Sequence, residues 1–312
     1  MEEAIDAMRI AFSSLSEGKS NVPQRYVTTM AGGKLNLLLK PASVDELNRG
    51  AIKVLTQKEV GAVRGIPAIV GIVLVLDMVT GEILSIMDGE YLTALRTGAA
   101  SGLATKHLAR KDSETVAIFG CGAQGKTQLE AATSVRNITK AWVFDRKEEA
   151  ARTFIAEMGP KLNIEIELAD SVSCLKGCDI ICTATNSEYP LFKRKDLKEG
   201  VHINAIGSFK PNMQEIDPLV LKDAKIFVDQ KGPCLAESGD LIKPLKEGLF
   251  TERHILGEIG ELILDRIEGR TKKNEITVFK SVGVAIQDFV VANSIYEKAL
   301  KEKFGTTFHL FE

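Results

Sequence analysis

The residues most suited to chemistry begin with a glycine pattern, GCGAQG at 120–125. A GxGxxG pattern alone is a weak signal, because glycine-rich turns also occur where no ligand binds. In a dinucleotide site each glycine has its own role. Gly120 permits a tight turn, Gly122 leaves room for a pyrophosphate, and Gly125 permits close packing of helix on sheet. The context of the pattern therefore decides between a nucleotide site and a plain turn.

That context favours a nucleotide. An apolar run at 116–119 precedes the pattern, and a second at 141–144 ends at Asp145, which predicts a βαβ unit with a helix N-terminus facing the phosphates. Asp145 lies twenty residues after Gly125, where a carboxylate can accept both hydroxyls of an adenine ribose. We therefore predict NAD as the cofactor. NADP remains the alternative, because Arg146 can pair with a 2′-phosphate.

Three basic residues stand out by their surroundings. Arg96 lies near the start of a helix rich in small residues, where a guanidinium and free N–H groups can bind a phosphate or a carboxylate. Lys53 lies within an apolar strand, and Arg25 follows Pro23 at a strand entrance. For each of them the alternative is an ordinary side chain that points to solvent.

The sequence gives little support to a metal site or a catalytic triad. Its four histidines form neither HExxH nor Ser-His-Asp spacing. Cys174, Cys178 and Cys182 recur at intervals of four, but a strand begins here and no His is close by, so buried thiols are the expected state. Five cysteines, an odd number, do not indicate a disulfide framework. We predict no metal.

Composition narrows the class of protein. A length of 312 residues predicts two domains, and a net charge of −2 gives no reason to expect nucleic acid or an anionic membrane as a partner. The most apolar run, 66–76, contains Pro67 and Gly71 and is too short to span a membrane. The N-terminus lacks the basic and apolar regions of a secretory signal, so we expect a cytoplasmic protein.

The predicted elements form two groups. The first combines a helix at 3–17, a mainly antiparallel sheet and a long helix at 91–109, which a polar hinge at 110–114 joins to the strand before the glycine pattern. The strands of that sheet are predicted at 26–30, 34–39, 51–55, 68–77 and 83–87.

After Asp145 helices and strands alternate, which predicts a parallel, doubly wound sheet. Helices are predicted at 147–158, near 172, at 258–267 and at 285–303, and strands at 164–168, 179–184, 202–206, 225–228 and 275–279. The last helix follows the last strand, so we expect it to return to the first domain. The predicted fold is α/β, with a Rossmann domain at 113–288 and a discontinuous α+β substrate and dimerisation domain at 1–112 and 289–312.

Five separated motifs resemble those of the ornithine cyclodeaminase/μ-crystallin family, in the same order and spacing. They are RTGAA at 96–100, GCGAQ at 120–124, HINAIG at 202–207, QEID at 214–217 and SVGVAIQD at 281–288. The resemblance implies a homodimer joined through the discontinuous domain and a small imino or amino acid as substrate. It implies that Arg25 and Lys53 hold the substrate carboxylate or lie beside the reacting carbon, and that Arg96 contacts both substrate and cofactor. Further cofactor contacts are implied at Thr97, Gly120, Gly122, Ala123, Gln124, Gly125, Asp145, Thr185, Ile206 and Ser281.

The chain departs from the family pattern in one segment, GSFKPNMQE at 207–215. Phe209 stands where cyclodeaminases and related archaeal alanine dehydrogenases carry an Asp, and a phenyl ring cannot take a proton from an amine or activate a water. Ser208 is its small polar neighbour, and we count it with Lys53 and Arg25 as a catalytic candidate. Met213 replaces a family Lys, and Ala68 replaces a cofactor-contacting Thr.

Reduction of a preformed cyclic imine makes fewer demands on the protein, because the iminium already carries its proton. The same segment resembles that of family members that reduce Δ1-pyrroline-2-carboxylate to proline, and this is the predicted reaction, with Phe209 beside the ring. The alternatives are an alanine dehydrogenase, an ornithine cyclodeaminase, and a non-enzymatic small-molecule binding protein of the μ-crystallin type.

Overall fold

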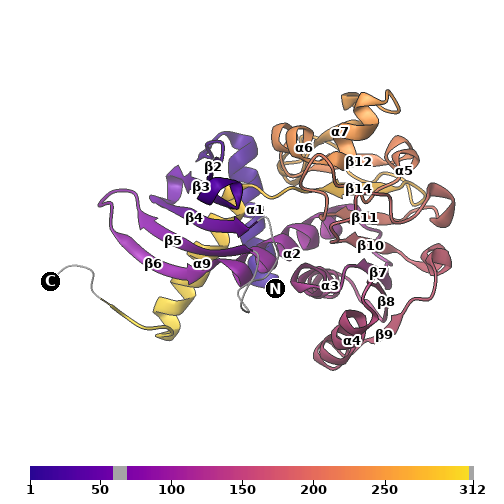
Figure 1. The fold of residues 1–312 in the computed structure, drawn as a ribbon, viewed down its shortest axis with the longest axis horizontal. Coiled ribbons are helices and arrows are strands. Elements are labelled where there is room, and N and C mark those ends of the chain that lie inside the picture. Colours follow the sequence, from indigo (N-terminus) through magenta and orange to yellow (C-terminus); the bar gives the residue numbers. More distant parts are fainter. Residues whose placement is uncertain (59–68, 309–312) are drawn as a thin grey trace. The chain divides into compact units, whose positions relative to one another are not determined.

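The computed structural model describes residues 1–58 and 69–308. The chain forms two compact units (Figure 1): residues 1–17 with 94–284, and residues 18–93 with 285–312. We call them the parallel unit and the antiparallel unit, after their sheets. These boundaries differ from the expected 1–112 and 289–312, because helix α1 (Glu2–Glu17) and most of helix α2 (Gly89–Leu108) belong to the same compact unit as the parallel sheet.

The parallel unit is built on an eight-stranded sheet in which every pair of neighbours is parallel. Its spatial order is β13-β12-β14-β11-β10-β7-β8-β9. The strands are β7 (Thr115–Phe119), β8 (Lys140–Phe144), β9 (Glu165–Leu168), β10 (Ile180–Thr183), β11 (His202–Ala205), β12 (Lys225–Val228), β13 (Ile255–Glu258) and β14 (Thr277–Lys280). The chain leaves β7 toward β9 on one side and returns through β10 on the other. This reversal creates the crevice at the carboxyl edge where such sheets bind ligands.

Helices cover both faces of this sheet, which is why its strands are apolar throughout. Val116 and Ile118 of β7 face one core with Leu129 and Phe154, while Ala117 faces the other core. The helices are α1, α2, α3 (Ala123–Val135), α4 (Glu148–Leu162), α5 (Pro218–Asp223), α6 (Lys231–Glu237), α7 (Gly239–Lys246) and α8 (Ile259–Ile263), with short helices η3 (Val172–Gly177), η4 (Arg194–Asp196) and η5 (Glu252–His254). The predicted doubly wound sheet is thus confirmed.

Some elements of this unit differ from the prediction. The expected helix at 258–267 is present but shorter, as α8, and β13 and the helices α5 to α7 were not predicted. Each of the latter is six to eight residues long, which is too short to show a helical period.

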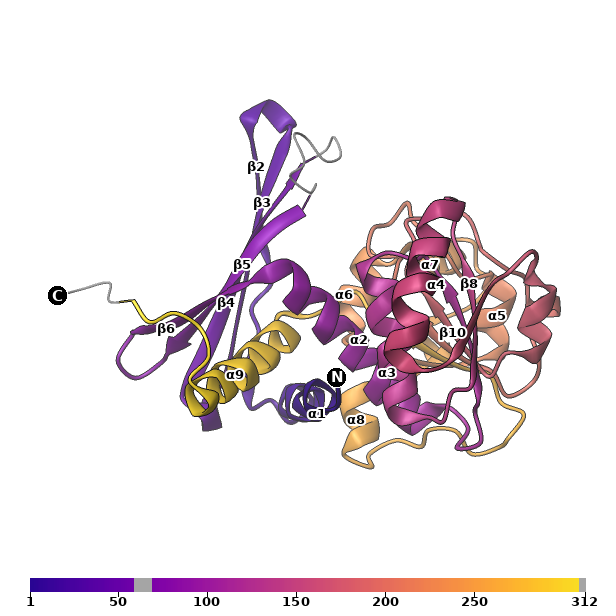
Figure 2. The same ribbon diagram turned by 90° about the horizontal axis from the view of Figure 1, so that it is seen from below.

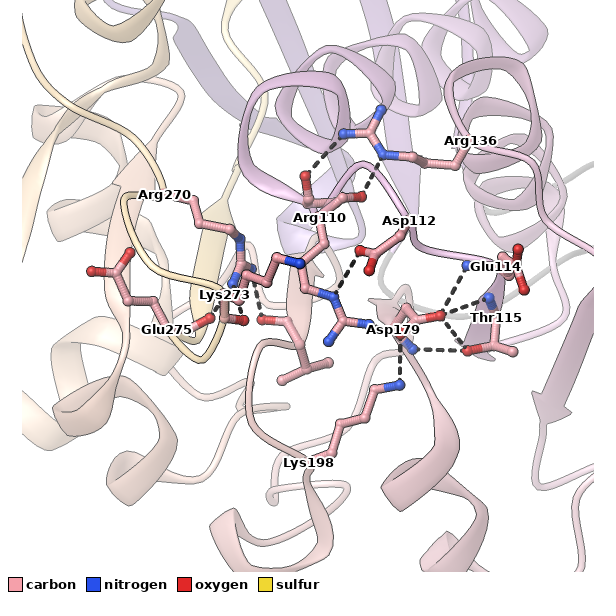
Figure 3. Close-up of polar contacts among 12 residues, drawn as sticks. Arg110, Asp112, Glu114, Thr115, Arg136, Asp179, Lys198, Arg270, Lys273 and Glu275 are labelled. Carbon is pink, nitrogen blue, oxygen red and sulfur yellow. Dashed lines mark hydrogen bonds and ion pairs between the residues drawn. The ribbon is translucent and has the colours of Figure 1, made fainter.

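The amino edge of the sheet holds a dense polar cluster (Figure 3). Asp179 accepts hydrogen bonds from Arg110, Lys198 and the backbone N–H groups of Glu114 and Thr115. Nearby, the Arg136 guanidinium donates to carbonyl oxygens at the C-terminal end of α2, including Thr105 O and, just after the helix, Ala109 O. A cation at a helix C-terminus is favourable for the helix dipole, so this cluster fixes the end of α2 opposite the edge that carries the glycine pattern.

The antiparallel unit is a six-stranded sheet with one long helix against it. The order is β1-β3-β4-β5-β6, with β2 also paired to β3. The elements are β1 (Ser20–Asn21), β2 (Tyr26–Met30), η1 (Ala31–Gly33), β3 (Leu35–Val44), η2 (Asp45–Leu47), β4 (Arg49–Lys58), β5 (Ile69–Asp77), β6 (Ile83–Asp88) and α9 (Ala285–Glu302). Figure 2 shows α9 lying along this sheet.

The two faces of this sheet differ. Val73 and Val75 lie on the face that α9 covers and are fully buried. Ile72 and Ile86, on the opposite face, are 41% and 46% exposed. The five predicted strands are confirmed, although β3 and β4 are longer than expected. Residues 66–68 of the apolar run, Ala68 among them, lie outside the described residues.

Candidate functional site

The glycine pattern forms the turn from β7 into α3. Gly120 has a φ of 95°, and a Cβ at this position would lie 2.6 Å from Ala184 O. A Cβ at Gly125 would collide with Gly120 O, so helix and strand approach as closely as backbones allow. Around Gly122, by contrast, a Cβ would meet nothing within 4 Å. The loop is therefore closed toward the sheet and open at Gly122, where a ligand would approach.

Helix α3 and strand β8 complete the nucleotide half. Ala123 and Gln124 form the first turn of α3, whose N-cap Gly122 offers no capping side chain, so the N–H groups of this turn suit an anion. Asp145, at the end of β8, accepts Cys121 N–H and Lys147 N–H, one on each carboxylate oxygen and each at 2.9 Å. These bonds fix the carboxylate beside the loop. The residues present thus fit a dinucleotide with an unphosphorylated ribose.

Two residues beside Asp145, Arg146 and Cys121, also affect the chemistry of this loop. Arg146 is exposed and donates to Asn186 Oδ1 at 3.2 Å, so its guanidinium is directed to the loop after β10. Burial, and then the Asp145 carboxylate, raise the pKa of the Cys121 thiol to about 12. Cys121 is therefore a neutral spacer in the loop at physiological pH.

The loops after β10 and β11 are held by one buried carboxylate, Glu215. It accepts hydrogen bonds from Thr183 Oγ1, from the backbone and hydroxyl of Thr185, and from Gly207 N–H, all at 2.6 to 2.7 Å. Burial and the neighbouring Asp240 raise the pKa of Glu215. Thr185 was expected at the cofactor, and the structure places it at the carboxyl edge of the sheet with its hydroxyl bound to Glu215.

A second buried group lies behind Glu215. Asp240 accepts the N–H groups of Glu215 and Ile216 and forms a buried ion pair with Lys280 at 3.1 Å. Ser208 is fully buried; its Oγ donates to Met213 O and accepts Asp240 N–H. The hydroxyl of Ser208 is thus engaged within its own loop.

The loop after β14 is held in the same way by Asp229. One of its carboxylate oxygens accepts Ser281 Oγ–H and the N–H groups of Val282 and Gly283. Gly283 has a φ of 81°, and a Cβ there would lie 2.8 Å from Arg96 Nη2. The structure therefore brings Arg96 and Ser281, two predicted site residues, to the same loop.

Phe209 differs from its neighbours in exposure. Ile206 and Thr97 are buried, whereas the Phe209 side chain is 40% exposed and its ring centroid lies 5.8 Å from Lys210 Nζ. The loop after β11 thus presents a partly exposed aromatic ring.

The antiparallel unit contributes Lys53, which is 2% exposed rather than directed to solvent. Its Nζ lies 2.8 Å from Asp288 Oδ1 and 3.0 Å from Thr93 Oγ1. Lys53 comes from β4, Asp288 from the first turn of α9, and Thr93 from the beginning of α2. The alternative interpretation of Lys53 as a solvated residue is therefore wrong.

A second buried lysine accompanies it. Lys40 of β3 pairs directly with Lys53 across the ladder, and opposite residues of antiparallel strands point to the same face. Arg25 directly precedes β2, whose first residue, Tyr26, pairs with Leu39. Continuing this register by one residue brings Arg25 level with Lys40. Three basic residues thus follow one line across β2, β3 and β4.

Sequence reasoning missed several residues of both halves: Lys40, Glu215, Asp229, Asp240, Lys280 and Asp288. A signal existed for some. Asp229 ends an apolar strand, as Asp145 does, and Glu215 and Asp288 lie inside motifs already noted.

Cys178 and Cys182 are buried thiols, as expected, while Cys174 is partly exposed. Within residues 1–58 and 69–308, no group of three or more His, Cys, Asp or Glu could hold a metal, and no helix could span a membrane.

Known proteins resemble this chain over nearly its whole length. The profile of the ornithine cyclodeaminase/mu-crystallin family matches residues 1–303. A Δ1-pyrroline-2-carboxylate reductase of Bacillus cereus is 40% identical over 98% of this chain and 94% of the relative. The structure of the Thermococcus litoralis Δ1-pyrroline-2-carboxylate reductase in complex with NADH and L-proline has a TM-score of 0.93 at 40% identity, covering 99% and 96% of the two chains. An archaeal alanine dehydrogenase dimer with bound NAD has a TM-score of 0.92 at 34% identity, covering 100% and 95%.

Proposed function

The chain belongs to the ornithine cyclodeaminase/μ-crystallin family, and from this premise we propose that it reduces Δ1-pyrroline-2-carboxylate to L-proline with NADH. The observation that carries the proposal is Phe209, an exposed aromatic ring in the loop after β11, combined with 40% identity to reductases of this imine. A cyclodeaminase needs a group that moves protons on the substrate amine at this place, and phenylalanine has none.

The cofactor would bind along the carboxyl edge of the parallel sheet. Gly122, Ala123 and Gln124 at the N-terminus of α3 would hold the pyrophosphate, and Asp145 the adenine ribose. Gly120 and Gly125 shape this loop, while Arg96, Thr97, Thr185, Ile206 and Ser281 line the predicted path of the remaining cofactor. When bound, NADH supplies the hydride for the C=N bond.

The substrate would be held by charge. Lys53 and Arg25 bind the carboxylate of the imine, and Arg96 contributes a further cation near the reacting end. The iminium form already carries its proton, so these residues need only orient the ring and stabilise its carboxylate. Phe209 packs against the ring. Ser208, with its hydroxyl bound to Met213 O, serves as a support for this loop rather than as a proton donor.

The proposal extends to assembly as a homodimer. The face of the antiparallel sheet away from α9 exposes Val70, Ile72 and Ile86, each more than 40% accessible, which is costly for a sheet face in water. A second copy of the chain would cover it, as an archaeal relative is a dimer. Light scattering should give twice the chain mass of 34.0 kDa. Ile72→Lys should yield monomers, while Ile10→Lys, at an exposed apolar position of α1, should not.

The activity is tested in three parallel assays. Two contain NADH, one with Δ1-pyrroline-2-carboxylate and one with pyruvate and ammonia. The third contains NAD and ornithine. The expected result is oxidation of NADH with the first, at a kcat/KM about tenfold or more above that with pyruvate and ammonia. A preference for pyruvate would instead make the chain an alanine dehydrogenase, and ammonia release from ornithine would make it a cyclodeaminase. Turnover of none would indicate a binding protein.

A further inference from the structure

Asp288 is the buried carboxylate beside Lys53, and the proposed reaction gives it no role. Its Oδ1 lies 2.8 Å from Lys53 Nζ, and both side chains are 2% exposed. A buried ammonium has lost most of its hydration, so the groups in contact with it decide whether it keeps its proton. The identity of its neighbours is therefore a chemical property of the site.

The directions of the hydrogen bonds around Lys53 show that its Nζ acts as a donor. Thr93 Oγ1 donates its only proton to Gly89 O at 2.5 Å, so it accepts from Lys53 Nζ at 3.0 Å. Lys53 thus donates to Thr93 and to Asp288 at the same time, which suits an ammonium. Asp288 lies in the first turn of α9, where the helix dipole favours a negative charge.

Three other described side chains lie near Lys53, and none of them carries a negative charge. Lys40 of β3 lies directly opposite on the same face and repels it. Val73, its partner on β5, is apolar. Arg49, on the same face of β4, adds a further cation but bonds Asn293 Oδ1 and Glu297 Oε1 of α9. Among the residues that the structure describes, Asp288 thus places a negative charge in direct contact with Lys53.

We propose that Asp288 is a positioning residue that keeps the Lys53 side chain an ammonium and aims it, and that it thereby sets the upper pH limit of substrate binding. The substrate named here rests on the proposed function. With Asp288 present, Lys53 meets the carboxylate of the imine as a cation across the whole neutral range. Without it, burial and Lys40 drive the proton from Lys53 at a lower pH.

The first test compares pH profiles of kcat/KM for Δ1-pyrroline-2-carboxylate. Asp288→Asn should lower kcat/KM about tenfold or more at pH 8 and move the alkaline limb down by about one pH unit or more, with the KM for NADH unchanged within about twofold. Asp288→Glu, which keeps the charge, should keep the parent's alkaline limb even if its rate falls. Glu297→Gln is the matched control, because it removes a carboxylate of the same helix from Arg49 and should leave the limb in place. An alkaline limb that does not move in Asp288→Asn overturns the proposal.

A second readout is independent of turnover. Nitrogen-detected NMR of the lysine side chains, with the Lys53 signal assigned from its loss in Lys53→Arg, reports the charge of this group directly. In Asp288→Asn this group should become a neutral amine at a pH about one unit or more below that of the parent, and equal titration in the two proteins would overturn the proposal. If the parent does not reduce the imine but Lys53 behaves as expected, the proposed function fails and this inference stands. If the imine is reduced and neither readout responds to Asp288→Asn, the inference alone fails.

Discussion

The two units hold their candidate residues by opposite means. In the parallel unit backbone geometry dominates, because glycines at 120, 122 and 125 shape one loop, and the buried carboxylates Glu215 and Asp229 fix others through N–H groups. In the antiparallel unit, side-chain charges from separate strands meet on one face, where Lys53 and Lys40 lie opposite each other. Substitutions in the first unit should therefore act through shape, and those in the second through charge.

The largest effect is expected from charge, with Lys53→Met. Losing a cation that binds the substrate carboxylate costs about 2 to 4 kcal/mol, a fall of about 30-fold to 1,000-fold in kcat/KM for the imine. The KM for NADH should stay nearly constant. Steady-state kinetics on both substrates measures this, with Lys58→Met, at the end of the same strand, as the control. A variant as active as the parent would remove Lys53 from the site.

Shape is tested at Gly122, where added atoms would meet no protein atom within 4 Å. Gly122→Val should leave the melting temperature nearly unchanged but weaken NADH binding about tenfold or more, because at least one charge-assisted hydrogen bond to the pyrophosphate, about 1.5 to 3 kcal/mol, is lost. Gly177→Val, at a second glycine with open surroundings, should change neither quantity. Unchanged NADH affinity by fluorescence titration would contradict the assigned position of the pyrophosphate.

A smaller effect is expected from the charge proposed to meet the adenine ribose. The Asp145 carboxylate, fixed by Cys121 N–H and Lys147 N–H, should repel a 2′-phosphate and make kcat/KM about tenfold higher for NADH than for NADPH. Asp145→Ala should bring this ratio toward one, whereas Asp170→Ala, after the next strand, should leave it unchanged. A parent that prefers NADPH by about a hundredfold would show that Arg146 governs the choice.

The smallest effect concerns stability rather than rate. His202 of β11 is fully buried between Thr277 Oγ1 and Asn204 Oδ1; burial, and then the Arg270 charge, lower its pKa from 6.5 to about 3. Above pH 6.5 both folded and unfolded states hold it neutral. As the pH is lowered from 6.5 to 3, only the unfolded state gains a proton, so the free energy of unfolding decreases. At pH 5 this group alone should lower it by about 2 kcal/mol relative to neutral pH.

Urea titrations of the parent and His202→Asn at pH 7.5 and pH 5 measure this contribution. The variant will differ from the parent at pH 7.5 through packing alone, and that difference serves as the reference. The gap between the two proteins should narrow at pH 5. A gap that stays constant would mean that His202 titrates normally in the folded state.

The same difference between the two units determines how much of each could be predicted from the sequence. The parallel unit repeats one local pattern, an apolar strand that ends in glycine or acid and a helix after it, so 116–119 and 141–145 can be interpreted without any distant contact. The alignment of Arg25, Lys40 and Lys53 depends on the register between strands. Arg25 and Lys53 are 28 residues apart in the sequence (53 − 25). Register is set by side-chain packing on both faces, which no local window contains.

The buried carboxylates were missed for a related reason. Glu215 bonds residues on two other loops, Thr185 and Gly207, and Asp288 pairs with a residue 235 positions earlier. In the sequence each stands inside a recognisable motif, but its partner is fixed only by the fold. A motif thus identified the correct segment without identifying which of its side chains mattered.

The position of β14 has a consequence for how the chain is made. Residues 277–280 form a strand between β11 and β12, although both of these are synthesised earlier, and α9 at 285–302 covers a sheet that is complete by residue 88. A growing chain on the ribosome can complete neither unit until residues 277–302 have emerged, so both units expose apolar surface until then. Termination before residue 277 would therefore leave both units incomplete, the parallel unit without β14 and the antiparallel unit without α9.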